Sequence, residues 1–138
     1  MVIRNTEERR VLDRFAKRHV FCWACGINPA RQRDLLHDDP RKLEIHHIAK
    51  HLRLHEIWNL SRLCQLCHRV AEGETVKYRG VPIPSLKPQH VFWLKQKFDS
   101  KNFDIQRIRK QWRAGVPDDP CDIPKWFKRQ HLRYRGGS

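Results

Sequence analysis

Two pairs of cysteines are the residues of this sequence best suited to bind a metal. They are Cys22, Cys25, Cys64 and Cys67, and 38 residues separate one Cys-x2-Cys pair from the other. Four thiolates on two tight turns match the tetrahedral coordination of zinc, and Gly26 lets the backbone turn beneath the metal. Two disulfides or four buried free thiols are the alternatives, but disulfides need an oxidising compartment, and the paired spacing favours a structural zinc. The fifth cysteine, Cys121, is expected to be buried as a small apolar residue.

A second group of polar residues lies between and beside the cysteine pairs. His46 and His47 are adjacent, Asn59 follows after 11 intervening residues, and His68 comes directly after Cys67. Adjacent side chains of a strand point to opposite faces, so one histidine could bind a metal while its neighbour stays available as a base. His68 would be held near the strand because zinc fixes the cysteine before it. The pattern predicts a metal-and-base site supported by a separate structural zinc.

These residues together resemble the HNH endonuclease motif in its zinc-knuckle variety. The resemblance is carried by Leu43–Ile48 (LEIHHI), Asn59-Leu60, Leu63–His68 (LCQLCH) and Cys22–Gly26 (CWACG). It covers about residues 21–72, somewhat more than a third of the chain, and leaves both flanks unexplained. It implies a ββα-metal core, in which a hairpin carries the adjacent histidines, a loop carries the asparagine and a helix carries the last histidine.

The resemblance also implies roles for these residues. His46 and His68 would be ligands of a catalytic divalent metal, His47 would be the general base, and Asn59 would hold the loop and the base in place. Many family members have Asp where His46 stands, so the softer ligand set here widens the metal choice toward Ni²⁺, Zn²⁺, Co²⁺ or Mn²⁺ as well as Mg²⁺. A neutral imidazole can take a proton from water near pH 7, and the expected products of phosphodiester hydrolysis are a 5′-phosphate and a 3′-hydroxyl.

Three further residues near this motif have weaker assignments. Glu44 lies two residues before His46, so on a strand it points to the same face and could orient a metal ligand; an ordinary surface ion pair is the alternative. His51 and His55 have the i, i+4 spacing of a helical metal site, but solvated or phosphate-facing roles are preferred for both.

The elements that position the motif are predicted from periodicity and from turn residues. Apolar residues at helical spacing behind an Asn5 cap predict a helix over about 6–18, and alternation predicts a strand over 43–48. Residues 49–63 are expected to form a loop or a short helix. A helix is expected over about 64–72, ended by a glycine.

The C-terminal half is expected to be helical and basic. Prolines make residues 81–88 a rigid connection, and i, i+3 and i+4 spacings predict amphipathic helices over about 88–98 and 103–113. Three later prolines are expected to break any further helix: Pro117, Pro120 and Pro124. Residues 125–135 mix cations with aromatic residues, as a nucleic-acid groove would, although a tail whose aromatic residues fold back on the helices explains the same pattern.

Composition identifies the kind of partner that this protein suits. The 138 residues carry 29 Lys+Arg against 15 Asp+Glu, a formal charge of +14, of which residues 71–138 contribute +8. This excess suits nucleic acid, and double-stranded DNA bound through its phosphates is the expected partner. No apolar run approaches the roughly 20 residues of a membrane helix, and the first ten residues lack the apolar core of a secretory signal. A membrane partner is therefore not expected, and the cytoplasm of a bacterial or phage-infected cell is the expected location.

The sequence as a whole predicts an α+β fold with a small ββα-metal core and a four-cysteine zinc site, flanked by N- and C-terminal helices. The expected divisions are an N-terminal helix over residues 1–20, the nuclease core over 21–75, and a basic helical extension of the same domain over 76–138. The expected function is that of a metal-dependent endonuclease that nicks or cuts DNA. The alternative is a zinc-knuckle nucleic-acid-binding protein without hydrolytic activity, since a protein–protein adaptor would not explain the charge.

Overall fold

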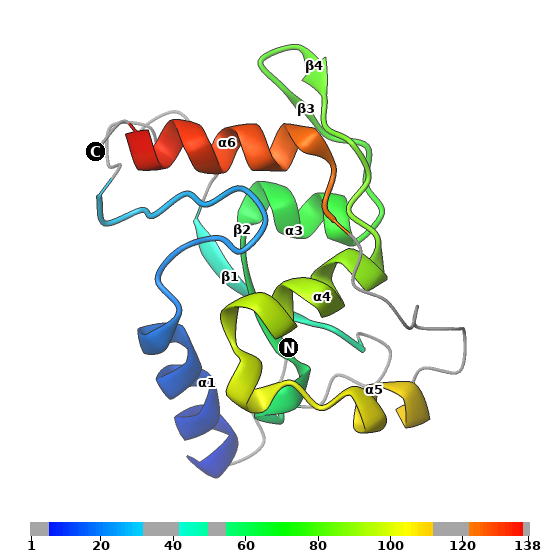
Figure 1. Ribbon diagram of the computed structural model, residues 1–138. Coiled ribbons are helices and arrows are strands. Elements are labelled where there is room, and N and C mark those ends of the chain that lie inside the picture. Colours follow the sequence, from blue (N-terminus) through cyan, green and yellow to red (C-terminus); the bar gives the residue numbers. More distant parts are fainter. Residues whose placement is uncertain (1–5, 32–41, 50–54, 112–121, 137–138) are drawn as a thin grey trace.

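The computed structural model of the protein describes residues 6–31, 42–49, 55–111 and 122–136. Its elements, in chain order, are α1 (Thr6–Arg18), β1 (Leu43–His47), the 3-10 helix η1 (Ile57–Asn59), β2 (Leu60–Cys64), α3 (Gln65–Ala71), β3 (Lys77–Tyr78), β4 (Val81–Pro82), α4 (Pro88–Phe98), the 3-10 helix η2 (Ser100–Asn102), α5 (Ile105–Gln111) and α6 (Lys125–Gly136). Helices surround the sheet of β1 and β2, whereas the sheet of β3 and β4 projects beyond one end of α6, so the fold is mixed α+β as predicted (Figure 1).

The hairpin of β1 and β2 is the centre of the fold. The two strands are antiparallel, with Leu43 opposite Cys64 and His47 opposite Leu60. Helix α3 begins at the residue after β2 ends, so the chain passes from the hairpin into the helix without a loop. The predicted strand 43–48 and helix 64–72 are confirmed to within a residue at each end. The segment 49–63, expected to be a loop or a short helix, contains η1 and most of β2.

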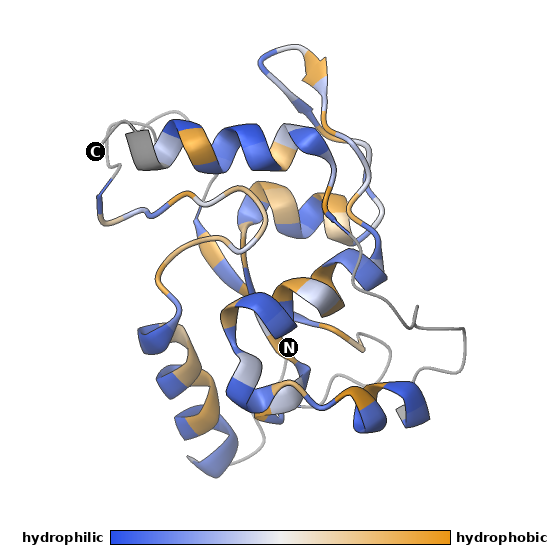
Figure 2. Cartoon of the chain, viewed as in Figure 1, coloured by the Kyte–Doolittle hydropathy of each residue, from blue (hydrophilic) through white to orange (hydrophobic). Residues whose placement is uncertain are grey.

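Helix α1 has the bounds that its periodicity predicts. Its apolar residues recur on one side, and Leu12 and Phe15 are buried. Acidic residues occupy the first turn and basic residues the last, which complements the helix dipole. In Figure 2 the apolar stripe of α1 faces the rest of the molecule. The chain then runs through residues 19–31 between α1 and α6 (Figure 1).

The segment before α4 is folded differently from the prediction. Strands β3 and β4 form a short hairpin around Arg79 and Gly80, which both have positive φ (52° and 78°). Two left-handed residues are typical of the tightest hairpin turns. The predicted rigid connection therefore begins only after Pro82. Helix α4 covers 88–98 as predicted, and α5 covers 105–111 of the predicted 103–113, whose last two residues lie outside the described ranges.

The prediction that prolines break any further helix is wrong for Pro124. Helix α6 begins at the next residue, and the carbonyl of Pro124 accepts a hydrogen bond from Phe127 N at 3.1 Å. A proline interrupts a helix interior because it lacks an N–H, but the first turn needs no such donor. Pro117 and Pro120 lie outside the described residues. Phe127 and Tyr134 of α6 are buried, and Trp126 packs against the core. The aromatic residues of the C-terminus therefore fold back on the protein.

A buried lysine connects α4 to the turn that leads into β2. Nζ of Lys95 donates to the Ile57 carbonyl at 2.7 Å and to Asp99 Oδ2 at 2.6 Å. Only 1% of the lysine is exposed, and its ammonium lies over the rings of Phe15 and Trp23. Burial lowers the pKa of Lys95, and Asp99 opposes that effect. This contact fixes η1 against the core.

None of the helices in the described part of the chain is long and apolar enough to cross a bilayer.

Candidate metal centre

The four predicted zinc ligands lie together in the interior. Their sulfur atoms all lie within 4.8 Å of one another, and all four cysteines are buried and free of disulfides. Sγ of Cys25 and Sγ of Cys64 are 3.7 Å apart. A zinc ion bound to four sulfurs at about 2.3 Å requires sulfur–sulfur separations of about 3.8 Å. The cluster could therefore hold a structural metal such as zinc, and the disulfide alternative is not formed.

The two cysteine pairs are built in the same way. Sγ of Cys22 accepts the backbone N–H of Cys25 at 3.4 Å, and Sγ of Cys64 accepts that of Cys67 at 3.4 Å. Gly26, with φ of 85°, lets the first turn close through hydrogen bonds between Gly26 N and Cys22 O and between Cys22 N and Ile27 O. The second pair joins β2 to α3. The four-cysteine cluster thus connects the loop after α1 to the central hairpin.

The pKa values of Cys22, Cys64 and Cys67 are shifted in opposite directions. Burial opposes the loss of a proton from Cys22, but hydrogen bonds from the three other cysteines outweigh burial and hold its pKa well below the usual value. Burial and hydrogen bonds with Cys22 and Cys25 raise the pKa of Cys64, against an opposing effect of Cys67. Hydrogen bonds with the three other cysteines, together with burial, raise the pKa of Cys67. One thiolate can be shared among the four sulfurs, whereas four thiolates need a divalent cation to offset their charge.

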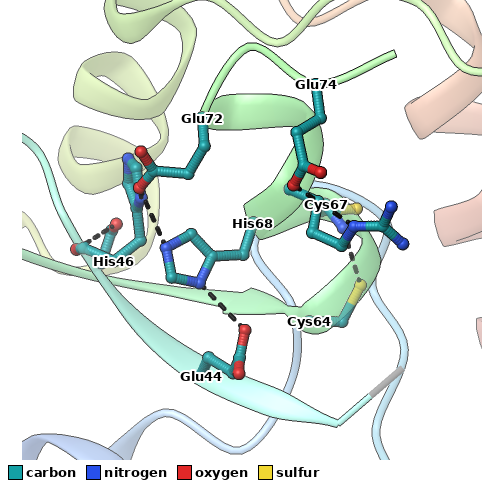
Figure 3. Close-up of polar contacts among 9 residues, drawn as sticks. Glu44, His46, Cys64, Cys67, His68, Glu72 and Glu74 are labelled. Carbon is teal, nitrogen blue, oxygen red and sulfur yellow. Dashed lines mark hydrogen bonds and ion pairs between the residues drawn. The ribbon is translucent and has the colours of Figure 1, made fainter. Parts of the chain in front are cut away.

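A second cluster of potential metal ligands lies on β1 and at the end of α3. It consists of His46, His68 and Glu72, whose ligand atoms lie within 4.8 Å of one another (Figure 3). Oε1 of Glu72 is 3.3 Å from His46 Nδ1 and 3.1 Å from His68 Nε2. Only 4% of the His46 side chain is exposed, against 37% of that of Glu72. The cluster is therefore anchored in the interior by one ligand and accessible from solvent at another.

Glu44 contacts His68 of α3 rather than His46, the histidine two residues later on the same strand. Its Oε1 lies 3.0 Å from His68 Nδ1 (Figure 3). Oε1 of Glu72 lies 3.1 Å from Nε2 on the other side of the ring, so each ring nitrogen of His68 faces a carboxylate. The sequence offers two interpretations of Glu44, an orienting partner of a metal ligand or a surface ion pair, and the contact with His68 is compatible with both.

His47 points away from this cluster. Its Nε2 lies 3.1 Å from Nδ1 of His55, and the two rings are 5.1 Å apart. His46, in contrast, packs its ring edge-on against that of His68 at 5.0 Å. The two adjacent histidines therefore have different surroundings, as the alternation of a strand predicts. His51, the other histidine of the predicted i, i+4 pair, lies outside the described residues, as does Cys121.

Asn59 holds the chain that follows the two histidines. Its fully buried side chain accepts the N–H of Ala49 at 2.7 Å, and its carbonyl accepts the N–H of Ile48 at 2.8 Å. Ser61 adds a hydrogen bond of 2.8 Å to the His46 carbonyl. The end of β1 is thus fixed on both sides of His47. The predicted role of Asn59 in holding the loop agrees with these contacts.

The sequence analysis assigns no functional role to two residues that the structure places beside the predicted site residues, Glu72 and His55. Glu72 enters there only as the end of a helix, although it lies four residues after His68, the spacing that places two side chains on one helix face. His55 enters only as the partner of His51.

The chain matches no model of a protein family, no curated protein and no solved structure.

Proposed function

We propose that this protein is a metal-dependent endonuclease of the HNH type that hydrolyses DNA. In this proposal β1, β2 and α3 form the ββα-metal core. The observation that carries it is the cluster of His46, His68 and Glu72, with His47 on the opposite face of the same strand. A protein that only binds nucleic acid has no need for this combination next to a four-cysteine site.

The donor set fits a catalytic divalent metal. Two imidazole nitrogens and one carboxylate oxygen suit Mn²⁺, Ni²⁺ or Zn²⁺, and the exposed carboxylate also suits Mg²⁺. His46 and His68 would hold the metal, as expected from the sequence, and Glu72 would be a third ligand. Glu44 would keep His68 in the tautomer that the metal needs. A bound divalent ion would offset the charge that develops on the phosphoryl and leaving oxygens.

His47 is the proposed general base, and the surrounding residues hold it. A neutral imidazole with a pKa near 6.5 can accept the proton of the attacking water at neutral pH. Asn59 fixes the two backbone N–H groups that directly follow His47. The base is thereby kept on the strand that also carries a metal ligand.

The proposed substrate is double-stranded DNA, bound through its phosphates. The outer face of α6 supports this choice, because its exposed residues are mostly cations: Lys125, Lys128, Arg129 and Arg133. The β3–β4 hairpin, which contacts α6 through Tyr78 and Trp126 at 6.4 Å, adds exposed Lys77 and Arg79. Among the described residues 75–82 and 122–134, Asp122 is the one acidic residue. This charge suits phosphate contacts.

The test is the cleavage of supercoiled plasmid in a panel of divalent metals. The purified zinc protein is expected to give nicked or linear product with at least one of Mg²⁺, Mn²⁺, Ni²⁺ or added Zn²⁺, and none with a chelator of the added metal. His47→Ala is expected to lower the rate about 10²–10⁴-fold while zinc content and DNA affinity stay unchanged.

Glu72→Gln separates the metal cluster from general effects at the end of α3. It is expected to raise the metal concentration needed for half-maximal rate. Glu74→Gln is the matched control, because Glu74 contacts Arg69 at 3.3 Å and belongs to neither cluster. If the protein binds DNA but does not cleave it with any metal of the panel, the result would favour the alternative of a zinc-knuckle nucleic-acid-binding protein.

A further inference from the structure

His55 contacts the residue that we propose as the base. Its Nδ1 lies 3.1 Å from Nε2 of His47, a hydrogen-bond distance, and the two rings are inclined by 47°. His55 directly precedes Glu56, whose carbonyl accepts the N–H of Asn59 at 2.8 Å. Both histidine side chains are half-buried. The contact therefore joins β1 to the point where the chain returns towards η1.

A hydrogen bond between two neutral imidazoles couples their tautomers. Each neutral ring has one N–H and one lone pair, so one ring must donate and the other must accept. If His47 donates from Nε2, its lone pair lies on Nδ1. If His55 donates instead, the only lone pair of His47 is already used at Nε2, and His47 cannot take another proton without breaking the bond.

We infer that His55 is a positioning residue that accepts the Nε2–H of His47 and thereby keeps the basic lone pair of His47 on Nδ1. This inference rests on the proposed function, because it takes His47 as the general base. A base held by a third group is a common arrangement in active sites. The proposed role of Glu44 follows the same principle, because Glu44 would orient His68 by accepting its Nδ1–H when a metal occupies Nε2.

Two substitutions test this role through the kinetics of cleavage. His55→Ala removes the acceptor, and we expect kcat to fall about 10- to 100-fold, the usual effect of losing an orienting partner. KM for DNA and the metal concentration for half-maximal rate should stay within about twofold. His55→Asn should recover most of kcat, because its Oδ1 is attached to Cγ as Nδ1 of histidine is and can accept the same N–H. A wild-type rate in His55→Ala would overturn the inference and leave the proposed function intact.

A spectroscopic measurement tests the same inference without cleavage. Two-bond ¹H–¹⁵N spectra of protein labelled at histidine report which ring nitrogen carries the proton, and His47→Ala identifies the signals of His47. We expect His47 to be protonated on Nε2 in the wild type and in His55→Asn, and to populate both tautomers in His55→Ala. An unchanged tautomer in His55→Ala would overturn the inference. If the wild type cleaves no DNA but the tautomer changes as expected, the proposed function fails while the assignment of His55 as the acceptor stands.

Discussion

His131 of α6 packs against the turn at Gly26, next to the four-cysteine cluster, and this packing can be tested by substituting Gly26. Nε2 of His131 donates to the carbonyl of Trp23, between the first two cysteines, at 3.1 Å. The ring of His131 stacks on Phe98 with an angle of 10° and meets Phe21 edge-on. A Cβ on Gly26 would overlap this ring, coming within 2.9 Å of two of its carbons. The aromatic contacts leave the ring little room to move away.

Gly26→Ala is therefore expected to destabilise the protein in two ways. A left-handed alanine costs about 1–2 kcal/mol, and displacing His131 loses a hydrogen bond of about 0.5–1.5 kcal/mol together with some aromatic packing. We expect a total loss of about 2–4 kcal/mol in the free energy of unfolding. Gly80→Ala is the matched control, because Gly80 has a φ of 78° but no atom within 4 Å of its Cβ position. It should lose only the backbone part, about 1–2 kcal/mol.

Denaturant unfolding of the zinc-loaded protein measures both variants. Alanine stiffens the unfolded chain equally in the two, so this effect cancels in the comparison. In a His131→Ala background the overlap disappears, and Gly26→Ala should then cost no more than Gly80→Ala. Equal losses for the two glycine variants in the wild-type background would refute the reasoning, because the ring would then give way without a penalty.

Three further outcomes are expected. Stripping the protein with a strong chelator should unfold it and release close to one zinc per chain, because structural zinc contributes on the order of 10 kcal/mol to folding; circular dichroism and metal analysis measure this. Burial lowers the pKa of His19 below 6.5, so the unfolded chain binds a proton where the folded protein does not. Stability should therefore fall as the pH drops below about 6.5, and thermal melts of His19→Gln should show a smaller fall; an identical fall would contradict this. Replacing Arg129 and Arg133 by alanine should reduce the slope of log affinity for DNA against log salt by about 1.8, two contacts at about 0.9 each, whereas replacing Arg9 and Arg14 of α1 should leave it unchanged.

Local patterns were sufficient to predict much of the framework. The helices 6–18 and 88–98 and the strand that begins at residue 43 follow from apolar periodicity, which depends only on which side of an element is buried. The four cysteines could be grouped because a tetrahedral metal restricts both their number and their spacing. The opposite surroundings of His46 and His47 follow from the alternation of a strand. In each case neighbours in the chain carry enough information.

Other features depend on residues that are distant in sequence, and only the tertiary structure decided them. Whether Pro124 prevents or precedes a helix depends on the core that receives Phe127 and Tyr134. Glu72 becomes a potential ligand because the β1–β2 pairing brings His46, 26 residues earlier, to the face of α3 that carries it. His55 contacts His47, eight residues earlier in the sequence, next to the end of β1 that Asn59 holds. Such contacts between particular side chains arise from the packing of whole elements, which no local pattern specifies.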